Sequence, residues 1–236
     1  MSSKHNSIFP IQSELDLCIK LEQWRNIGNT NMLLVHCIRL DYVWSSTQLT
    51  KFKAENVFRT WDVISTSLIN SRVVDSHTEL RKHTGMFSKL GLVLDVPPQN
   101  ILGTHCRDVF FPSHIGTENR EKKKNSWKLA DAIFSGVGKK GGKKNWPINE
   151  GKSYNVIESP FDILSKANFK SYNEILVIGK PGVSLYPGYP PTQEVKVTGI
   201  IVDKNNTRSG GLHSYYLNEG IRDLSRLNPG LRVIYM

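Results

Sequence analysis

The sequence predicts a chain of mixed α and β structure, and three observations support this. Apolar runs bounded by Gly, Pro or polar residues indicate strands in residues 31–41, 61–68 and 92–96. Apolar positions at helical spacing predict helices over residues 14–27 and 76–90. The length of 236 residues and the 39% of hydrophobic residues are enough for one large or two small domains with a real core.

The N-terminal part supplies the first helix and the first strand. Ser13 stands where it can cap a helix over residues 14–27, and residues 1–12 are expected to be a loose lead-in. Residues 31–41 contain the apolar run MLLVHCIRL, which is typical of a buried central strand. Residues 42–60 are polar and mixed, as in helix and loop.

Two polar residues interrupt the apolar strand. Burying an unpaired guanidinium is very costly, so Arg39 either meets an anion or pairs internally with Asp41 on the same strand face. His36 points to the opposite face, and we expect a structural histidine there rather than a catalyst.

The strand at residues 61–68 carries three consecutive hydroxyls. Neighbours on a strand point to opposite faces, so Ser65 and Ser67 share one face and Thr66 takes the other. Strand hydroxyls are usually structural, and their meaning depends on the rest of the chain.

The remaining segments follow in order. Residues 76–90 start with capping-box spacing between Ser and Glu, residues 92–96 end at a Pro pair, and residues 101–115 resemble a loop. The C-terminal part is expected to form a helical turn, a strand that begins with an acid, a second strand paired with it, a helix and a last strand. These are residues 161–166, 171–178, 194–202, 214–227 and 231–235.

The chain is basic, with 31 Lys and Arg against 21 Asp and Glu and a net charge of +10. Such a surface attracts nucleic acid, anionic membrane, acidic proteins or phosphate-bearing ligands. Much of the excess lies in residues 116–160, a basic insertion whose glycine–lysine run lacks the spacing of a P-loop and is expected to be a flexible loop.

Several classes of protein are disfavoured. No run approaches the roughly 20 apolar residues of a membrane span, and the N-terminus lacks an apolar signal core. The three cysteines are widely spaced and form no zinc motif, so we expect no metal and a reducing compartment.

Three motifs in this order resemble the ADP-ribosyltransferase family of bacterial toxins, in the Arg–Ser–Glu branch with a cholera- and pertussis-toxin-like core. The first is Arg39 with Asp41 in the pattern Arg-x-Asp, and the second is Ser65-Thr66-Ser67 between Ile and Leu. The third is Glu174 at the head of an apolar strand. The resemblance covers about residues 30 to 202.

The resemblance implies NAD as substrate, without a metal, and gives each motif a role. Glu174 would stabilise the oxocarbenium-like ribose when the nicotinamide bond breaks. Arg39 would bind the diphosphate with paired donors, which accounts for a charge on an apolar strand. Ser65 would contact Glu174 directly and act with Arg39 in catalysis, while Thr66 and Ser67 would complete the NAD-binding strand.

The resemblance also implies a fold and a setting. We expect a single α+β domain over residues 1–236, with two small, roughly perpendicular sheets around an NAD cleft. The chain would be a monomeric effector, secreted by a bacterium and acting on a protein in the host cytosol. The C-terminal hypervariable effector regions of Tc toxin complexes are one expected source, with actin or a Rho-type GTPase as first acceptors to consider.

One position departs from the family. Members that modify arginine usually carry Glu two residues before the catalytic Glu, and here Tyr172 occupies that position. Tyr172 would face the acceptor, with a structural aromatic as the alternative, and the resemblance therefore does not name the acceptor residue.

Three other readings stay open. Water as acceptor would make the chain an NAD glycohydrolase, and a nucleobase would make it a nucleic-acid-directed transferase, which the charge permits but no nucleic-acid motif supports. The third is a basic nucleic-acid-binding module without enzymatic activity, dependent on the lysines of residues 139–144.

Overall fold

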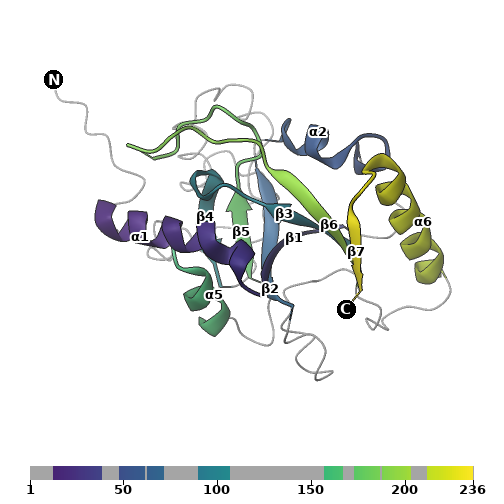
Figure 1. The fold of residues 1–236 in the computed structure, drawn as a ribbon, viewed down its shortest axis with the longest axis horizontal. Coiled ribbons are helices and arrows are strands. Elements are labelled where there is room, and N and C mark those ends of the chain that lie inside the picture. The colour runs from purple at the N-terminus through teal and green to yellow at the C-terminus, as the bar shows by residue number, and fades with distance from the viewer. Residues whose placement is uncertain are drawn as a thin grey trace, which may run out of the picture.

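The fold is a seven-stranded sheet flanked by helices, seen in a computed structural model of the chain (Figure 1). The structure describes residues 13–38, 48–61, 63–71, 90–106, 157–166, 173–186, 188–202 and 212–235. Within these residues the α-helices and strands are α1 (Glu14–Arg25), β1 (Met32–Ile38), α2 (Ala54–Phe58), β2 (Ile64–Asn70), β3 (Leu90–Asp95), β4 (Ile101–His105), α5 (Pro160–Lys166), β5 (Glu174–Val177), β6 (Lys196–Val202), α6 (Leu212–Leu227) and β7 (Arg232–Tyr235). The predicted mixture of α and β structure is confirmed.

The apolar run around residue 35 forms the central strand β1, as predicted. β1 pairs antiparallel with β2 on one side and with β3 on the other. Leu34 and Val35 point to opposite faces and are both buried, so both faces of the sheet are covered here. Arg39 and Asp41, the two alternatives for an anion site or an internal pair, lie outside the described residues.

β2 belongs to two ladders at once. Its first residues pair with β5, with Ser65 opposite Leu176, and its later residues pair with β1, with Ser67 opposite Val35. β2 therefore joins the β4–β5 strands and the β1, β3, β6 and β7 strands into one seven-stranded sheet, and the two small, roughly perpendicular sheets implied by the resemblance stay a prediction. The strand order is β4-β5-β2-β1-β3-β6-β7, and β6–β7 is parallel while the other described pairs are antiparallel.

Two predictions around β3 and β4 are wrong. Leu90 begins β3 rather than ending a helix; residues 76–89 of that predicted helix lie outside the described residues. Residues 101–105 form β4 rather than a loop, and they pair with β5. β3 ends at Asp95, just before the proline pair, as predicted, and a 3₁₀ turn at Pro98–Asn100 then leads into β4.

The predicted pairing of residues 194–202 with the preceding strand is also wrong. β6 pairs with β3 and β7. β5 has no edge left for β6, because β2 occupies one of its edges and β4 the other.

The flanking helices lie at opposite ends of the sheet. Figure 1 shows α1 and α5 on the β4–β5 side and α2 and α6 on the β6–β7 side. In α1 the predicted cap is confirmed, since Ser13 accepts a hydrogen bond from the Asp16 amide, and Leu17, Leu21 and Trp24 are buried at helical spacing. The expected C-terminal helix and strand are α6 and β7.

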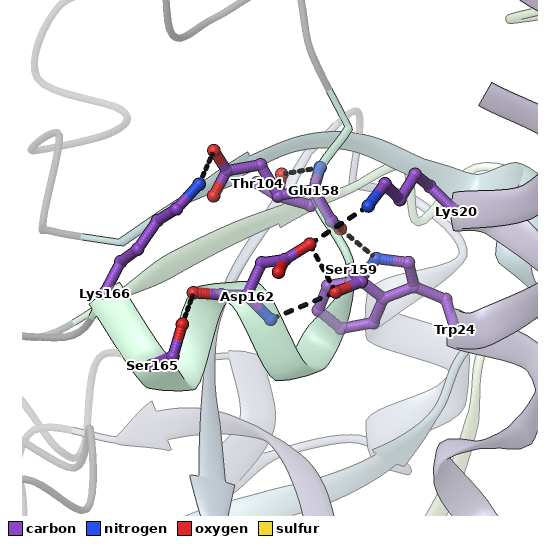
Figure 2. Close-up of polar contacts among 8 residues, drawn as sticks. All are labelled: Lys20, Trp24, Thr104, Glu158, Ser159, Asp162, Ser165 and Lys166. Atoms are coloured by element: carbon purple, nitrogen blue, oxygen red, sulfur yellow. Dashed lines mark hydrogen bonds and ion pairs between the residues drawn. The ribbon is translucent and has the colours of Figure 1, made fainter. Parts of the chain in front are cut away.

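The predicted helical turn near residue 161 is α5, and a polar cluster ties it to α1 (Figure 2). Lys20 lies 3.0 Å from Asp162, and the Trp24 indole donates to the Glu158 carbonyl at 2.7 Å. The Glu158 amide in turn donates to the Thr104 hydroxyl of β4 at 2.8 Å. We call Lys20, Trp24, Glu158 and Asp162 the α1–α5 clamp.

No helix in the described part of the chain is both long and apolar enough to cross a bilayer.

Candidate active site at the β2–β5 junction

Three consecutive hydroxyls of β2 hold three consecutive residues at the start of β5. The Ser65 hydroxyl donates to Oε1 of Glu174 at 2.6 Å. Thr66 donates to the Ile175 carbonyl at 2.8 Å, and Ser67 donates to the carbonyl of the residue before Glu174 at 3.1 Å. The structure therefore brings together the second and third sequence motifs, which are 109 residues apart at the Ser65–Glu174 contact.

Strand geometry explains why Ser65 meets the carboxylate. β2 and β5 are antiparallel with Thr66 opposite Ile175, so Ser67 and Glu174 are the next positions along the two strands. Ser65 and Ser67 share a face because side chains alternate along a strand, and Ser65 reaches Glu174 along the diagonal. The predicted contact between Ser65 and Glu174 is present in the structure.

Glu174 is a buried acid, with only 3% of its surface exposed. The 2.6 Å hydrogen bond from the Ser65 hydroxyl orients the carboxyl group. Buried carboxyl groups need such partners, because desolvation disfavours their charged form. Glu174 is therefore a buried carboxyl group held in one orientation at the start of β5.

His105 on β4 lies directly opposite Glu174 across the β4–β5 ladder. Burial lowers the pKa of His105 to about 3, so the ring stays neutral at ordinary pH. The ring leans over Gly103, where an added Cβ would come within 3.0 Å of Nε2. Glycine at that position therefore makes room for the imidazole beside Glu174. The sequence reading missed this residue because it placed it in a loop.

His36 on β1 makes a hydrogen bond to the backbone of Ser65. Its Nδ1 lies 2.9 Å from the Ser65 carbonyl and donates to it, and its ring packs edge-on against Phe58 and Trp61. Burial lowers the pKa of His36, and the hydrogen bond to Ser65 offsets this in part. The predicted structural histidine is thus seen in a structural contact, but one made to a residue of the candidate site.

Asn173 is a further residue that the sequence reading missed. Its side chain accepts a hydrogen bond from the Leu68 amide at 2.7 Å and donates to the Leu68 carbonyl at 2.8 Å. The sequence predicts a strand over residues 171–178 that includes Asn173, and an asparagine inside a predicted strand carries no signal of its own. Its position immediately before the predicted catalytic acid is the feature that could have drawn attention to it.

The roles of the remaining predicted site residues stay predictions. Arg39 and Tyr172 lie outside the described residues, and their roles toward diphosphate and acceptor stay predictions. Thr66 and Ser67 are buried and donate to the backbone carbonyls of Ile175 and Asn173, and a direct contact of either with NAD also stays a prediction. Among the residues that the structure describes, no group of His, Cys, Asp and Glu could hold a metal ion.

Comparison with known proteins adds no name to this geometry: no family model, curated protein or solved structure matches the chain.

Proposed function

We propose that the chain is an NAD-dependent mono-ADP-ribosyltransferase, with Glu174 as its catalytic carboxylate and the ADP-ribosyltransferase fold implied by the sequence resemblance. The observation that carries this proposal is the 2.6 Å hydrogen bond from Ser65 to Glu174. A Ser-Thr-Ser strand and a strand-leading Glu were singled out together from the sequence, and they are adjacent in the sheet.

The chemistry asks for a fixed carboxylate. Breaking the bond between the nicotinamide nitrogen and ribose C1′ leaves positive charge on the ribose, and the bond's electron pair departs with nicotinamide. A preorganised carboxylate stabilises that charge without having to reorient, and Ser65 keeps Glu174 in one orientation. The acceptor then attacks C1′ and loses its proton. Arg39 would hold the diphosphate during this step.

The proposed setting is that of a bacterial toxin effector acting in the host cytosol, with a host protein as acceptor. Actin and a Rho-type GTPase are the first acceptors to test. The net charge of +10 suits an acidic partner of either kind. Tyr172 is proposed to face this acceptor.

The test incubates the purified chain with labelled NAD and a eukaryotic cytosolic extract. We expect one labelled protein band, and we expect Glu174→Gln to reduce labelling by about a hundredfold or more, as loss of a preorganised catalytic group does. The matched control is Glu194→Gln, which makes the same change of charge at a side chain that is half exposed and 3.9 Å from Arg59.

Each alternative activity has its own signature in this assay. Nicotinamide release without a labelled macromolecule identifies an NAD glycohydrolase, and label in DNA or RNA identifies a nucleic-acid-directed transferase. Absence of NAD turnover in every arm contradicts the proposal. The binding-module hypothesis would then be tested by deleting residues 139–144 and measuring salt-dependent nucleic-acid binding.

A further inference from the structure

The residue immediately before the candidate catalytic acid is tied to β2 by its side chain. Asn173 has 2% of its surface exposed, and its carboxamide makes two hydrogen bonds to one residue, Leu68. The Leu68 amide donates to Oδ1 at 2.7 Å, and Nδ2 donates to the Leu68 carbonyl at 2.8 Å. A third bond joins the same place, since Ser67 donates to the Asn173 carbonyl at 3.1 Å.

This arrangement continues the sheet with a side chain in place of a backbone. Two residues facing each other in an antiparallel pair can exchange one N–H and one C=O each way. The β2–β5 backbone register extends only to Thr66 opposite Ile175. Beyond that point the Asn173 carboxamide supplies the donor and the acceptor that Leu68 would otherwise find in a neighbouring strand. Glu174 therefore lies between the last backbone pair and the side-chain pair.

We propose that Asn173 is a positioning residue that sets the place of Glu174 beside Ser65, so that the rate of NAD turnover depends on it. This inference deepens the proposed function and rests on it. Asn173 acts through Glu174 and is not assigned a contact with the reacting atoms. Small displacements of a catalytic group, on the order of 1 Å, can reduce a rate by about a hundredfold.

The side chain at this position must be an amide of this length. Asp keeps the acceptor for the Leu68 amide but loses the donor, and it places a second carboxyl group next to Glu174. Ser is too short to reproduce both bonds. Either change leaves a buried polar group of Leu68 without the partner it now has.

The chain contains a matched control at the other end of the same strand. Asn100 is fully buried, and its Nδ2 donates to the carbonyls of Ile178 and Gln193 at 2.8 and 2.7 Å. Its Oδ1 accepts from the Gln193 amide at 2.9 Å. Asn100 and Asn173 thus hold the two ends of β5 through the same kind of bond, but only Asn173 adjoins Glu174.

The kinetic experiment compares Asn173→Ser with Asn100→Ser in the full chain, with folded fractions measured by circular dichroism. Both variants are expected to lose thermal stability. Per folded molecule, Asn173→Ser is expected to lower kcat for NAD about tenfold to a hundredfold while KM for NAD changes by less than about threefold. Asn100→Ser is expected to keep both constants near those of the unaltered protein. Equal kcat values for the two folded variants would overturn the inference.

A structural measurement separates failure of this inference from failure of the proposed function. Crystal structures of both variants give the distance from Ser65 Oγ to Glu174 Oε1, now 2.6 Å. We expect it to lengthen only in Asn173→Ser, and an unchanged distance there overturns the inference whether or not NAD is turned over. Absence of turnover by the unaltered protein would instead contradict the proposed function.

A measurement on the unaltered protein covers the case in which Asn173→Ser does not fold. Amide hydrogen exchange reports whether the Leu68 amide is held by Asn173. Protection equal to that of the β1–β2 ladder supports the inference. Exchange as fast as that of exposed turns overturns it.

Discussion

The α1–α5 clamp and the β2–β5 junction both join distant segments of the chain, but with different chemistry. The junction comprises Ser65, Thr66 and Ser67 of β2 with Asn173, Glu174 and Ile175. Each joins segments that are far apart in sequence, by 142 residues between Lys20 and Asp162 and by 109 between Ser65 and Glu174. The clamp includes an ion pair between Lys20 and Asp162, whose side chains are 25% and 43% exposed, beside the buried Trp24. The junction is buried except at Ser65, which is half-buried, and it is held by neutral hydroxyls and one carboxamide.

The difference follows from the cost of desolvation. Charges that keep part of their water can pair at little cost, whereas buried charges lose far more than a single partner returns. Neutral donors that bond to backbone carbonyls avoid this penalty. Glu174 is the one acid among the described residues of the junction, so its presence there calls for a reason beyond stability. Catalysis is the reason proposed above.

The largest expected effect comes from the buried part of the clamp. Trp24→Ala removes a side chain that is buried in the core and the indole bond to the Glu158 carbonyl. Loss of packing on this scale costs about 3–5 kcal/mol. Urea unfolding of this variant beside Lys20→Met measures it, and similar values for the two would show that charge, not burial, carries the clamp.

Acid should lower the stability of the chain at pH values between about 3 and 6.5 through His105, the histidine opposite Glu174. An unfolded histidine binds its proton near pH 6.5, whereas folded His105 remains neutral until about pH 3. The unfolded state therefore takes up more protons as the pH falls, and the free energy of unfolding drops by about 1.4 kcal/mol per pH unit for this residue. The lowered pKa of His36 adds an effect of the same sign.

The measurement for this prediction is urea unfolding between pH 7 and pH 5. His105→Gln is expected to show a shallower dependence on pH than the unaltered protein. Identical slopes would mean that the pKa of His105 is the same in the folded and unfolded chain, which contradicts the prediction.

A smaller effect is expected from removing one buried hydroxyl. Thr66→Val keeps the shape of the side chain but loses the 2.8 Å bond to the Ile175 carbonyl. We expect a loss of about 1–2 kcal/mol in the free energy of unfolding. Ser165→Ala on α5, whose exposed hydroxyl bonds the Asp162 carbonyl, is the control and should lose less.

The smallest effect is expected from the charged pair of the clamp. Lys20→Met removes the ion pair with Asp162 and should cost less than about 1 kcal/mol. The difference from the unaltered protein should shrink in 1 M salt, since salt screens exposed charges. A loss that is large and independent of salt would place this pair with the buried contacts instead.

Residues 101–105 show where sequence patterns stop short. A glycine and a histidine interrupt their apolar pattern, and a proline pair precedes them, so nothing local marks a strand. These residues form a strand because they pair with the edge of β5 that β2 leaves open. The same cause explains the wrong partner for β6, because pairing depends on which edges are already occupied. Long segments such as α1 and β1 were predictable because the spacing of apolar residues within each segment indicates its structure, whatever the rest of the chain does.

The candidate site was predictable to a similar degree. Ser65 and Glu174 could be joined in advance because a strand's alternation and a family resemblance both pointed to them. Asn173 and His105 could not, since their roles arise from what lies across the sheet. An amide that replaces a backbone pair leaves no periodic trace in the sequence.

The separation of 109 residues between Ser65 and Glu174 also has a consequence for the order of folding. Contacts between distant segments form late, because closing a long loop costs entropy before any contact repays it. The β1–β2 ladder joins nearer segments, such as Val35 with Ser67, and can assemble while β5 is still undocked. Glu174 then reaches Ser65 only in the final steps. A refolding chain is expected to regain its circular dichroism before the proposed NAD turnover, so that this activity would report when the last part of the fold is complete.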